Sequence, residues 1–406
     1  MAPPWFRDRR EHSGWVRCAT PGSRRRLGVD FGECQLLETP DVQPVRLFDA
    51  VRVQQPYRAA IDAAITAVLD SGCFVLGPAV ADFEASFAQY CGVAHGIGVG
   101  NGSDALELAL RALDVGVGSS VVTVANAGGY ATSAIRACGG EPVYVDIDPD
   151  TLLVDCSALS AALSRRPAAL IVTHLYGQLA PITRIVADCA ARGVPVIEDC
   201  AQAHGAARGG RRAGSFGDVG CFSFYPTKNL GALGDAGALV TDDAELAARL
   251  RALRQYGWTR KYVNQLAHGR NSRLDELQAA LLSIKLPQLD DDNQRRREIV
   301  RRYDAGIRHP EIWPLLGRGG GDDVGHLYVL RCARRSALQA HLSSRGIDSD
   351  VHYPQPDHLQ PAWRAALPRS LPATEAAAAE VLSLPCHPAL TDEELARVID
   401  AVNSFH

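Results

Sequence analysis

Residues 221–237 have the sequence CFSFYPTKNLGALGDAG, which is the most informative stretch of the chain for fold and function. An apolar, aromatic run typical of a strand stops at Pro226, and Lys228 follows two residues later. Glycines then recur at every third position, at Gly231, Gly234 and Gly237. Because glycine permits left-handed and closely approached backbone, this pattern predicts a loop that wraps around a ligand. Lys228 is the only lysine in residues 1–260, and a desolvated lysine can attack a carbonyl, whereas arginine cannot. An ordinary surface lysine in a turn is the alternative.

Length and composition are those of a globular protein. The 406 residues, 47% hydrophobic and 22% charged, suffice for two domains or for one large and one small domain. A formal net charge of −4 gives no basis for a nucleic-acid partner or an anionic membrane surface. No apolar run approaches the roughly 18 residues that span a bilayer. The first residues lack the apolar centre of a signal peptide.

The 11 cysteines are scattered through the chain without CxxC pairs and without the spacing of metal ligands. Several of them lie inside apolar runs, where cysteine serves as a small core residue. This usage differs from that of a disulfide framework. We therefore predict reduced cysteines, a cytoplasmic location and no metal site.

The chain divides into three predicted parts. Residues 1–45 contain arginine clusters, proline and glycine without periodicity, and we predict a basic, disordered arm. Upstream sequence from a misplaced start site and a tail that contacts an anionic partner are the alternatives. Residues 46–285 are predicted to form a large domain, and residues 286–406 a small C-terminal domain.

Strand and helix patterns alternate through the predicted large domain. Apolar runs typical of strands occupy residues 121–124, 142–145, 169–172 and 195–197. Helical patterns occupy residues 103–114, 129–138, 157–164 and 182–192, after an apolar helical stripe formed by Ile61, Ala64, Ile65, Val68 and Leu69. This alternation predicts an α/β fold with a parallel sheet covered on both faces and sites at the carboxyl ends of the strands. Farther on, residues 272–302, 336–345, 373–381 and 392–402 read as helical, and residues 327–330 as a strand.

Three further stretches could carry chemistry. Residues 98–104 (GVGNGSD) form a glycine-rich turn before a helix, where free N–H groups and the helix dipole suit a phosphate, although Asn101 or Ser103 could be a helix cap only. Asp199 follows an apolar strand and could hold the ring nitrogen of a heterocycle protonated, or could cap a helix. Tyr130 also follows a strand and could stack on such a ring, or could be a core residue.

The order of these parts resembles that of a known family, the DegT/DnrJ/EryC1/StrS sugar aminotransferases. The resemblance runs from about Val45 to the C-terminus. Six blocks carry it, at residues 100–110 (GNGSDALELAL), 174–178 (HLYGQ), 198–205 (EDCAQAHG), 223–231 (SFYPTKNLG), 271–280 (NSRLDELQAA) and 352–354 (HYP). It implies the fold of type I pyridoxal phosphate-dependent transferases, with a large domain that binds the cofactor on a mostly parallel sheet and a small α+β C-terminal domain.

The resemblance also implies roles for individual residues. Lys228 would hold pyridoxal 5'-phosphate as a Schiff base and later shuttle a proton, while Asp199 would pair with the pyridine nitrogen. Gln202 would lie near the ring 3-hydroxyl, and Tyr130 would stack on the ring. The phosphate would be held by Gly102, Ser103 and Ser223. Asn271 would reach the cofactor phosphate of a neighbouring subunit, since the family forms homodimers with shared active sites.

The reaction implied is transamination, because family members that are dehydratases have histidine in place of Lys228. The donor would be L-glutamate and the acceptor a keto group on a nucleotide-linked 6-deoxyhexose. The form of residues 271–275 (NSRLD) resembles that of members that aminate C3. Amination at C4, a keto-cyclitol acceptor and a cofactor-binding regulator without turnover are the alternatives. Candidate contacts to the nucleotide sugar are Arg260, Lys261, His326, His352 and Tyr353.

Overall fold

The computed structural model describes residues 43–363 and 370–406, so almost all of the predicted basic arm lies outside the described residues. Val45 is fully buried, donates its N–H to the oxygen of Gly346 at 2.8 Å and accepts from Asp348 at 2.9 Å. The described chain therefore begins as an extended segment against the C-terminal region. The predicted domain boundary between residues 285 and 286 stays a prediction.

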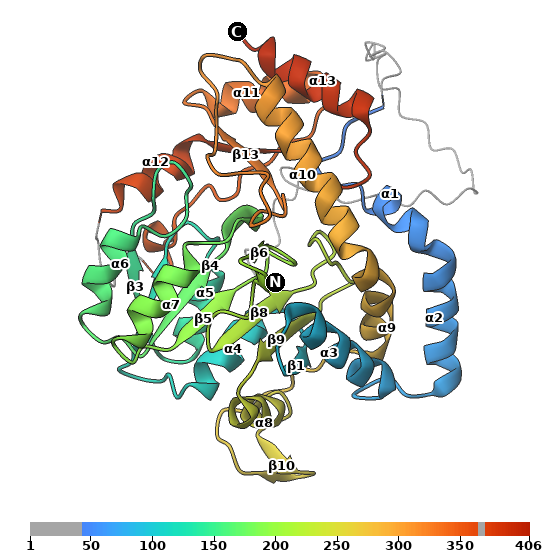
Figure 1. Cartoon of the computed structure of the whole chain (residues 1–406), viewed down its shortest axis with the longest axis vertical. Helices are drawn as coiled ribbons and strands as arrows, with labels where there is room; N and C mark the ends of the chain where they lie inside the picture. The colour runs from blue at the N-terminus through green and yellow to red at the C-terminus, as the bar shows by residue number, and fades with distance from the viewer. Residues whose placement is uncertain (1–42, 364–369) are drawn as a thin grey trace, which may run out of the picture. The chain divides into compact units, whose positions relative to one another are not determined.

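A seven-stranded sheet forms the centre of the structure (Figure 1). Its strands are β1 (His95–Val99), β2 (Ser120–Val124), β3 (Glu141–Val145), β4 (Ala169–Thr173), β5 (Val196–Asp199), β8 (Val219–Ser223) and β9 (Gly237–Thr241). Their spatial order is β1-β9-β8-β5-β4-β2-β3, and β9 alone runs antiparallel to both of its neighbours. The predicted strands are thus present, and the sheet is mostly parallel.

Successive strand residues point to opposite faces of the sheet, and each face has its own hydrophobic core. The helices up to α9 are α1 (Ala50–Gln54), α2 (Arg58–Ser71), α3 (Pro78–Cys91), α4 (Gly102–Ala112), α5 (Tyr130–Ala137), α6 (Cys156–Leu163), α7 (Ile182–Ala190), α8 (Ala244–Leu253) and α9 (Glu276–Lys285). In β2, Val121 packs into the core under α4, α5 and α8, whereas Val122 packs into the core on the opposite face, with α3, α6, α7 and α9. A strand buried on both faces reads as a continuous apolar run, which is why β2 and β4 could be predicted.

The C-terminal region packs around a third core and a three-stranded sheet of order β12-β13-β14 (Figure 1). Its elements are α10 (Leu289–Gly306), β12 (Trp313–Pro314), β13 (Tyr328–Arg331), α11 (Arg335–Ser344), α12 (Pro372–Glu380), β14 (Val381–Leu384) and α13 (Asp392–Asn403). Two short hairpins, β6 (Ala207–Arg208) with β7 (Arg211–Arg212) and β10 (Trp258–Arg260) with β11 (Val263–Asn264), complete the strands of the described residues. The C-terminal region thus combines helices with a small sheet, as the predicted fold class has it.

The structure adds detail to two helical predictions. The stretch at residues 272–302 contains two α-helices, over residues 276–285 and from residue 289 onward, with Pro287 in a 3-10 turn between them. The apolar stripe of α2 is only partly buried, since Ile61 and Val68 lie inside while Leu69 is 63% exposed. Among the described residues, no helix is long and apolar enough to cross a membrane.

Candidate active site

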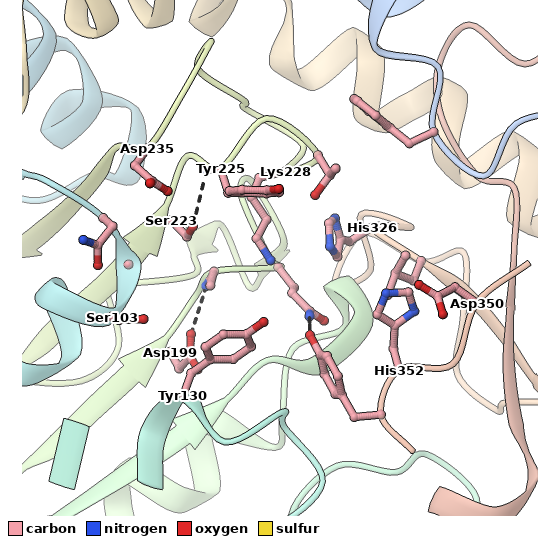
Figure 2. A pocket seen from close by; sticks show the side chains of 18 of the residues that line it. Ser103, Tyr130, Asp199, Ser223, Tyr225, Lys228, Asp235, His326, Asp350 and His352 are labelled. Carbon is pink, nitrogen blue, oxygen red and sulfur yellow. Dashed lines mark hydrogen bonds between the residues drawn. The ribbon is translucent and has the colours of Figure 1, made fainter. Parts of the chain in front are cut away.

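A cavity of about 640 Å³ opens at the carboxyl ends of β5 and β8 (Figure 2). This volume suits a small organic ligand, and the edge of a parallel sheet is the usual place for one. Ten predicted site residues line the cavity: Gly102, Ser103, Tyr130, Asp199, Gln202, Ser223, Lys228, His326, His352 and Tyr353. The fold therefore brings together residues that are far apart in the sequence.

Lys228 enters the cavity from a tightly turned loop after β8. Its N–H donates to the oxygen of Tyr225 at 2.8 Å, and a Cβ on Gly231 would lie 2.5 Å from the oxygen of Pro226, so only glycine fits there. The buried ammonium of Lys285 donates to the oxygen of Gly231 at 2.6 Å. These contacts fix the loop backbone while the Lys228 amine makes no hydrogen bond within the described part of the chain. Burial lowers the pKa of Lys228 to about 8, and the charge of Asp199 opposes this shift.

Asp199 is the last residue of β5 and is buried beside the same cavity. Its backbone oxygen accepts from the N–H of His174 at 3.1 Å, and its Oδ1 accepts from the N–H of Ala201 at 3.2 Å. Burial raises the pKa of Asp199, while the nearby charge of Lys228 lowers it. A buried carboxyl group of this kind is stabilised as carboxylate by a cationic partner in the cavity, such as a protonated ring nitrogen.

The first turn of α4 also lines the cavity. Asn101 caps the helix, because its side-chain oxygen accepts from the N–H of Asp104 at 2.8 Å. A Cβ on Gly102 would lie 2.6 Å from the Cβ of Ser223, so the absence of a side chain lets the helix start approach β8. The N–H groups of this turn, the helix dipole and two serine hydroxyls, of Ser103 and Ser223, are a donor set that fits a phosphate dianion.

Gln202 and two tyrosines line the remaining wall. The side-chain oxygen of Gln202 accepts from the N–H of Tyr176 at 2.6 Å, so its amide nitrogen must be the donor to the Tyr353 hydroxyl at 3.1 Å. The ring of Tyr353 meets that of Tyr130 edge to face, with centroids 6.2 Å apart. Tyr130 is 49% exposed, so part of its ring remains accessible at the cavity (Figure 2).

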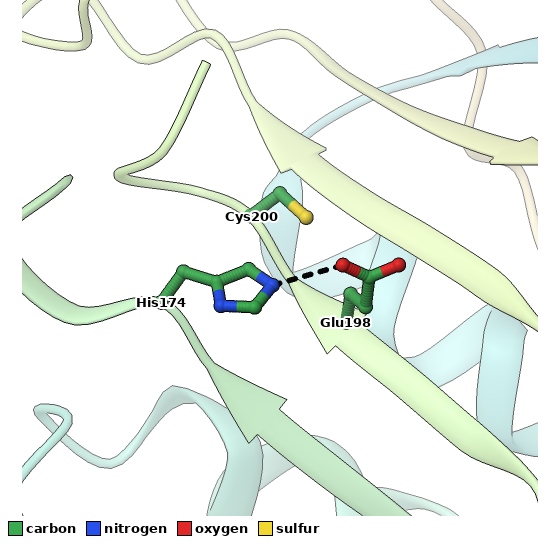
Figure 3. A group of neighbouring side chains, drawn as sticks. All are labelled: His174, Glu198 and Cys200. Carbon is green, nitrogen blue, oxygen red and sulfur yellow. Dashed lines mark hydrogen bonds and ion pairs between the residues drawn. The ribbon is translucent and has the colours of Figure 1, made fainter. Parts of the chain in front are cut away.

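His174, Glu198 and Cys200 form a buried group whose ligand atoms lie within 4.8 Å of one another (Figure 3). Nδ1 of His174 accepts from the N–H of Ala180 at 3.1 Å, so the proton is on Nε2, which donates to Glu198 at 2.9 Å. Both oxygens of Glu198 also accept backbone N–H groups at 2.7–3.1 Å, from Gly214, Phe216 and Gly217. Burial raises the pKa of the Cys200 thiol well above its usual range. The group is therefore a hydrogen-bonded support for β5, with no lone pair of His174 free for a metal ion.

Three candidate residues lie away from the cavity. Asn271 is exposed and pairs with Gln255 in an isolated bridge. Arg260 and Lys261 are exposed on the β10–β11 hairpin, where the Lys261 ammonium lies 5.1 Å from the ring centroid of Tyr262. The roles assigned to these residues, like those of the ten lining residues, stay predictions.

Sequence reasoning did not single out several lining residues: Leu47, Phe48, Tyr225, Thr227, Asp235, Arg296 and Asp350. Two of them, Tyr225 and Thr227, stand next to Lys228 in the chain and could have been found by that proximity. Asp350 stands two residues before His352. Arg296 and Phe48 come from segments whose apolar and charged patterns gave no signal of a site, because only the packing of the C-terminal region places them there.

The lysine loop after β8, the acid at the end of β5 and the glycine-containing turn at the start of α4 match the class to which the solved relatives belong, fold type I of the pyridoxal phosphate-dependent transferases. A profile of the DegT/DnrJ/EryC1/StrS aminotransferase family matches residues 56–403. The chain belongs to this family, as its sequence predicted.

Relatives of known name agree with this placement. The dTDP-3-amino-3,6-dideoxy-alpha-D-galactopyranose transaminase of Aneurinibacillus thermoaerophilus is 46% identical over 361 residues, which cover 89% of this chain and 99% of the relative. The crystal structure of S. venezuelae DesV, in complex with a ketimine intermediate, superposes with a TM-score of 0.86 at 44% identity and covers 89% and 98% of the two chains. NtdA from Bacillus subtilis, with bound cofactor PMP, gives a TM-score of 0.83 at 29% identity and covers 89% and 85%. The predicted fold class is confirmed.

Proposed function

We propose that this protein is a pyridoxal phosphate-dependent aminotransferase that moves the amino group of L-glutamate to the C3 keto group of a nucleotide-linked deoxyhexose. The observation that carries the proposal is the joint placement of Lys228, Asp199 and the first turn of α4 on one cavity. An amine, an acid and a phosphate-binding turn are the groups that this cofactor needs from its protein.

The bound cofactor would supply an aldehyde carbon to receive the amino group and a protonated ring to spread the charge left by a departing proton. Asp199 would hold the proton on the ring nitrogen. Lys228 would bind the aldehyde and, as a free amine, would shuttle a proton between the amino-bearing carbon of the substrate and the cofactor in each half of the reaction. A pKa of about 8 leaves an appreciable fraction of this amine neutral near pH 7, which a general base requires.

Other lining residues would orient the ring. Gln202 has one amide hydrogen committed to Tyr353 and a second one free to donate to the oxygen at ring position 3. Tyr130 would stack on the ring, and the donors of the α4 turn and Ser223 would hold the phosphate. The ring would then be fixed at its nitrogen, its oxygen and its phosphate, while Lys228 reaches the carbon that reacts.

The choice of a C3 keto sugar rests on two supports. Residues 271–275 have the form of C3-aminating members of the family, and the relative from A. thermoaerophilus carries C3 amination in its name. The donor is assigned as L-glutamate because the family uses it. A reduced cytoplasmic setting agrees with the free thiols of the described cysteines, six of which are buried.

A homodimer with shared active sites completes the proposal. Leu69, Phe74 and Val75 expose apolar surface, and Val75 pairs with Asp275, close in the chain to Asn271. Asn271 lies near this exposed apolar surface and does not line the cavity of its own chain. This arrangement is expected where a second subunit docks. Asn271 would then reach the partner's phosphate site.

The test uses purified protein, pyridoxal phosphate and L-glutamate with nucleotide-linked 3-keto and 4-keto deoxyhexoses. We expect glutamate and the cofactor alone to give one equivalent of 2-oxoglutarate, and repeated turnover only when a keto sugar is present, with the new amine at C3 by NMR. Amination at C4, or of a keto-cyclitol alone, would overturn the assignment of the acceptor. A protein that exchanges no amino group between glutamate and the cofactor would overturn the reaction itself.

A further inference from the structure

His326 ends a chain of buried hydrogen bonds whose directions can all be deduced. Nδ2 of Asn293 lies 2.8 Å from the backbone oxygen of His204, and Oδ1 of Asn293 lies 2.8 Å from Nδ2 of Asn229. Nδ2 of Asn229 also lies 3.1 Å from the oxygen of Val324. The last link joins Oδ1 of Asn229 to Nδ1 of His326 at 2.9 Å.

Two backbone oxygens decide which atom donates in every link, because a carbonyl oxygen only accepts. The oxygens of His204 and Val324 require amide nitrogens of Asn293 and Asn229 opposite them. Each amide must therefore present its oxygen to the next group along the chain. It follows that Nδ1 of His326 carries a hydrogen and donates it to Asn229.

The other ring nitrogen of His326, Nε2, is consequently a bare acceptor. The residue is 6% exposed and lines the same cavity as Lys228 (Figure 2), and Nε2 has no hydrogen-bond partner among the described residues. Burial, with the charges of Lys228 and Arg296 next in size, lowers the pKa of His326 well below its usual range. The ring thus stays neutral at physiological pH and offers a lone pair, not a proton.

An acceptor of this kind favours a ligand that donates. A carboxylate has acceptor oxygens only, so the carboxylates of an amino-acid donor cannot form a hydrogen bond with Nε2 and would be repelled by its lone pair. A sugar carbonyl at the reacting position has hydroxyl groups on the neighbouring carbons, and an O–H group can donate. We propose that Nε2 of His326 accepts a hydrogen bond from the sugar hydroxyl on a carbon adjacent to the keto carbon, and thereby selects acceptors that carry this hydroxyl.

This inference rests on the proposed function, since it assumes a keto-sugar acceptor. Its structural premise can be tested without turnover. Nitrogen-15 NMR of histidine-labelled protein reconstituted with the cofactor should assign to His326 a protonated Nδ1 and a bare Nε2. The Nε2 resonance should move upfield when the amino-sugar nucleotide product is added. A protonated Nε2 would overturn the proposal.

The second test compares nucleotide keto sugars with their analogues lacking the hydroxyl at C2 or at C4. For the wild type, one of the two deoxy analogues should lose about tenfold in kcat/KM and in product affinity measured by calorimetry, because a buried acceptor is left unpaired. In His326→Phe, the same deoxygenation should cost less than about twofold. His326→Gln, whose side-chain oxygen can accept, should keep part of the discrimination. His341→Gln, on α11 outside the cavity, is the matched control and should discriminate like the wild type.

Asn229→Leu provides a second route if His326→Phe fails to fold, because it removes the acceptor that fixes the tautomer. Its discrimination between hydroxyl and deoxy acceptors should also shrink. Equal deoxygenation costs in the wild type and in His326→Phe would overturn this inference while leaving the aminotransferase assignment in place. A wild type that aminates no keto sugar would overturn both. If His326→Phe slowed the glutamate half-reaction and the sugar half-reaction equally, His326 would act on Lys228 and not on the sugar, and this inference would be overturned.

Discussion

The Lys228 amine and the Asp199 carboxyl group share one buried cavity, and each charge shifts the pKa of the other toward its ionised form. Burial acts in the opposite direction on both groups and is the larger effect. In the proposed reaction, Lys228 would be a base that is partly neutral near pH 7, and Asp199 an acid that pairs with a cationic ring.

Lys228→Ala should abolish covalent attachment of pyridoxal phosphate. We expect the absorption band of the protein-bound cofactor to disappear and amino transfer to fall at least about 10³-fold, because both the attachment point and the base are lost. Lys285→Met is the matched control, since Lys285 is also buried, with a pKa lowered by burial to about 8, but donates to the oxygen of Gly231. That variant should keep the band. Loss of the band in Lys285→Met but not in Lys228→Ala would contradict the assignment.

Reconstitution of the cofactor-free protein should depend on pH through Lys228. Only the neutral amine attacks an aldehyde, so the rate should rise about tenfold per pH unit below the pKa and level off above about pH 8. Stopped-flow absorbance between pH 6 and 10 would measure this, with free Nα-acetyl-lysine, whose pKa is about 10.4, as the reference. A protein profile that keeps rising to pH 10, like that of the free amine, would show that burial does not lower the pKa.

Glu198→Gln should destabilise the fold without removing a group from the cavity. Burial opposes ionisation of Glu198, but hydrogen bonds from His174, Gly217 and Gly214 outweigh it and keep its pKa below the usual value. We expect the free energy of unfolding in urea to fall by about 2–4 kcal/mol.

The same pKa shift makes this contribution depend on pH. A carboxyl group with a lower pKa in the folded state stabilises the fold above its unfolded pKa of about 4.3, and this contribution is lost as the pH falls through the folded value. The difference in unfolding free energy between wild type and Glu198→Gln should therefore shrink in acid. A difference that is constant from pH 7 to pH 3 would contradict the role of the carboxylate.

Gly102→Ala should weaken cofactor binding through steric contact alone. The new Cβ would lie 2.6 Å from the Cβ of Ser223, so the start of α4 must move away from β8. We expect a loss of about 10- to 100-fold in cofactor affinity and about 1–3 kcal/mol in stability, the usual cost of overpacking. Gly116→Ala serves as the control, because a Cβ there would meet nothing within 4 Å. Titration of both variants with pyridoxal phosphate compares them directly.

Charges placed on the exposed apolar face of α2 and the following loop should disrupt the proposed dimer. Leu69 is 63% exposed and Phe74 54% exposed, and Leu69→Asp with Phe74→Glu would force two charges into the interface. Light scattering coupled to gel filtration should give a mass near 87 kDa for the wild type, about twice the 43.5 kDa chain, and a monomer for the variant. Val117→Asp, at a residue 95% exposed elsewhere, should stay dimeric. A monomeric wild type would refute the dimer.

Local sequence was sufficient wherever one segment makes its own contacts. The apolar runs of β2 and β4 identify strands because both faces of these strands are buried. The start of α4 can be predicted because Asn101 caps the helix and Gly102 lets it approach Ser223 closely. The loop that carries Lys228 could also be predicted from its sequence, since its backbone leaves no room for a side chain at Gly231.

Contacts between distant segments decided the rest. Nothing local distinguishes β9, which runs antiparallel, from its parallel neighbours, because strand direction depends on how the chain returns to the sheet. The sequence by itself determined the family, the fold class and the groups gathered around Lys228. Only the tertiary structure decided that Arg296 and Asp350 join them, that the Lys228 amine is buried enough to lose its proton near pH 8, and that His326 presents a bare nitrogen. Burial, charge proximity and hydrogen-bond direction are properties of the packed molecule, and no single segment encodes them.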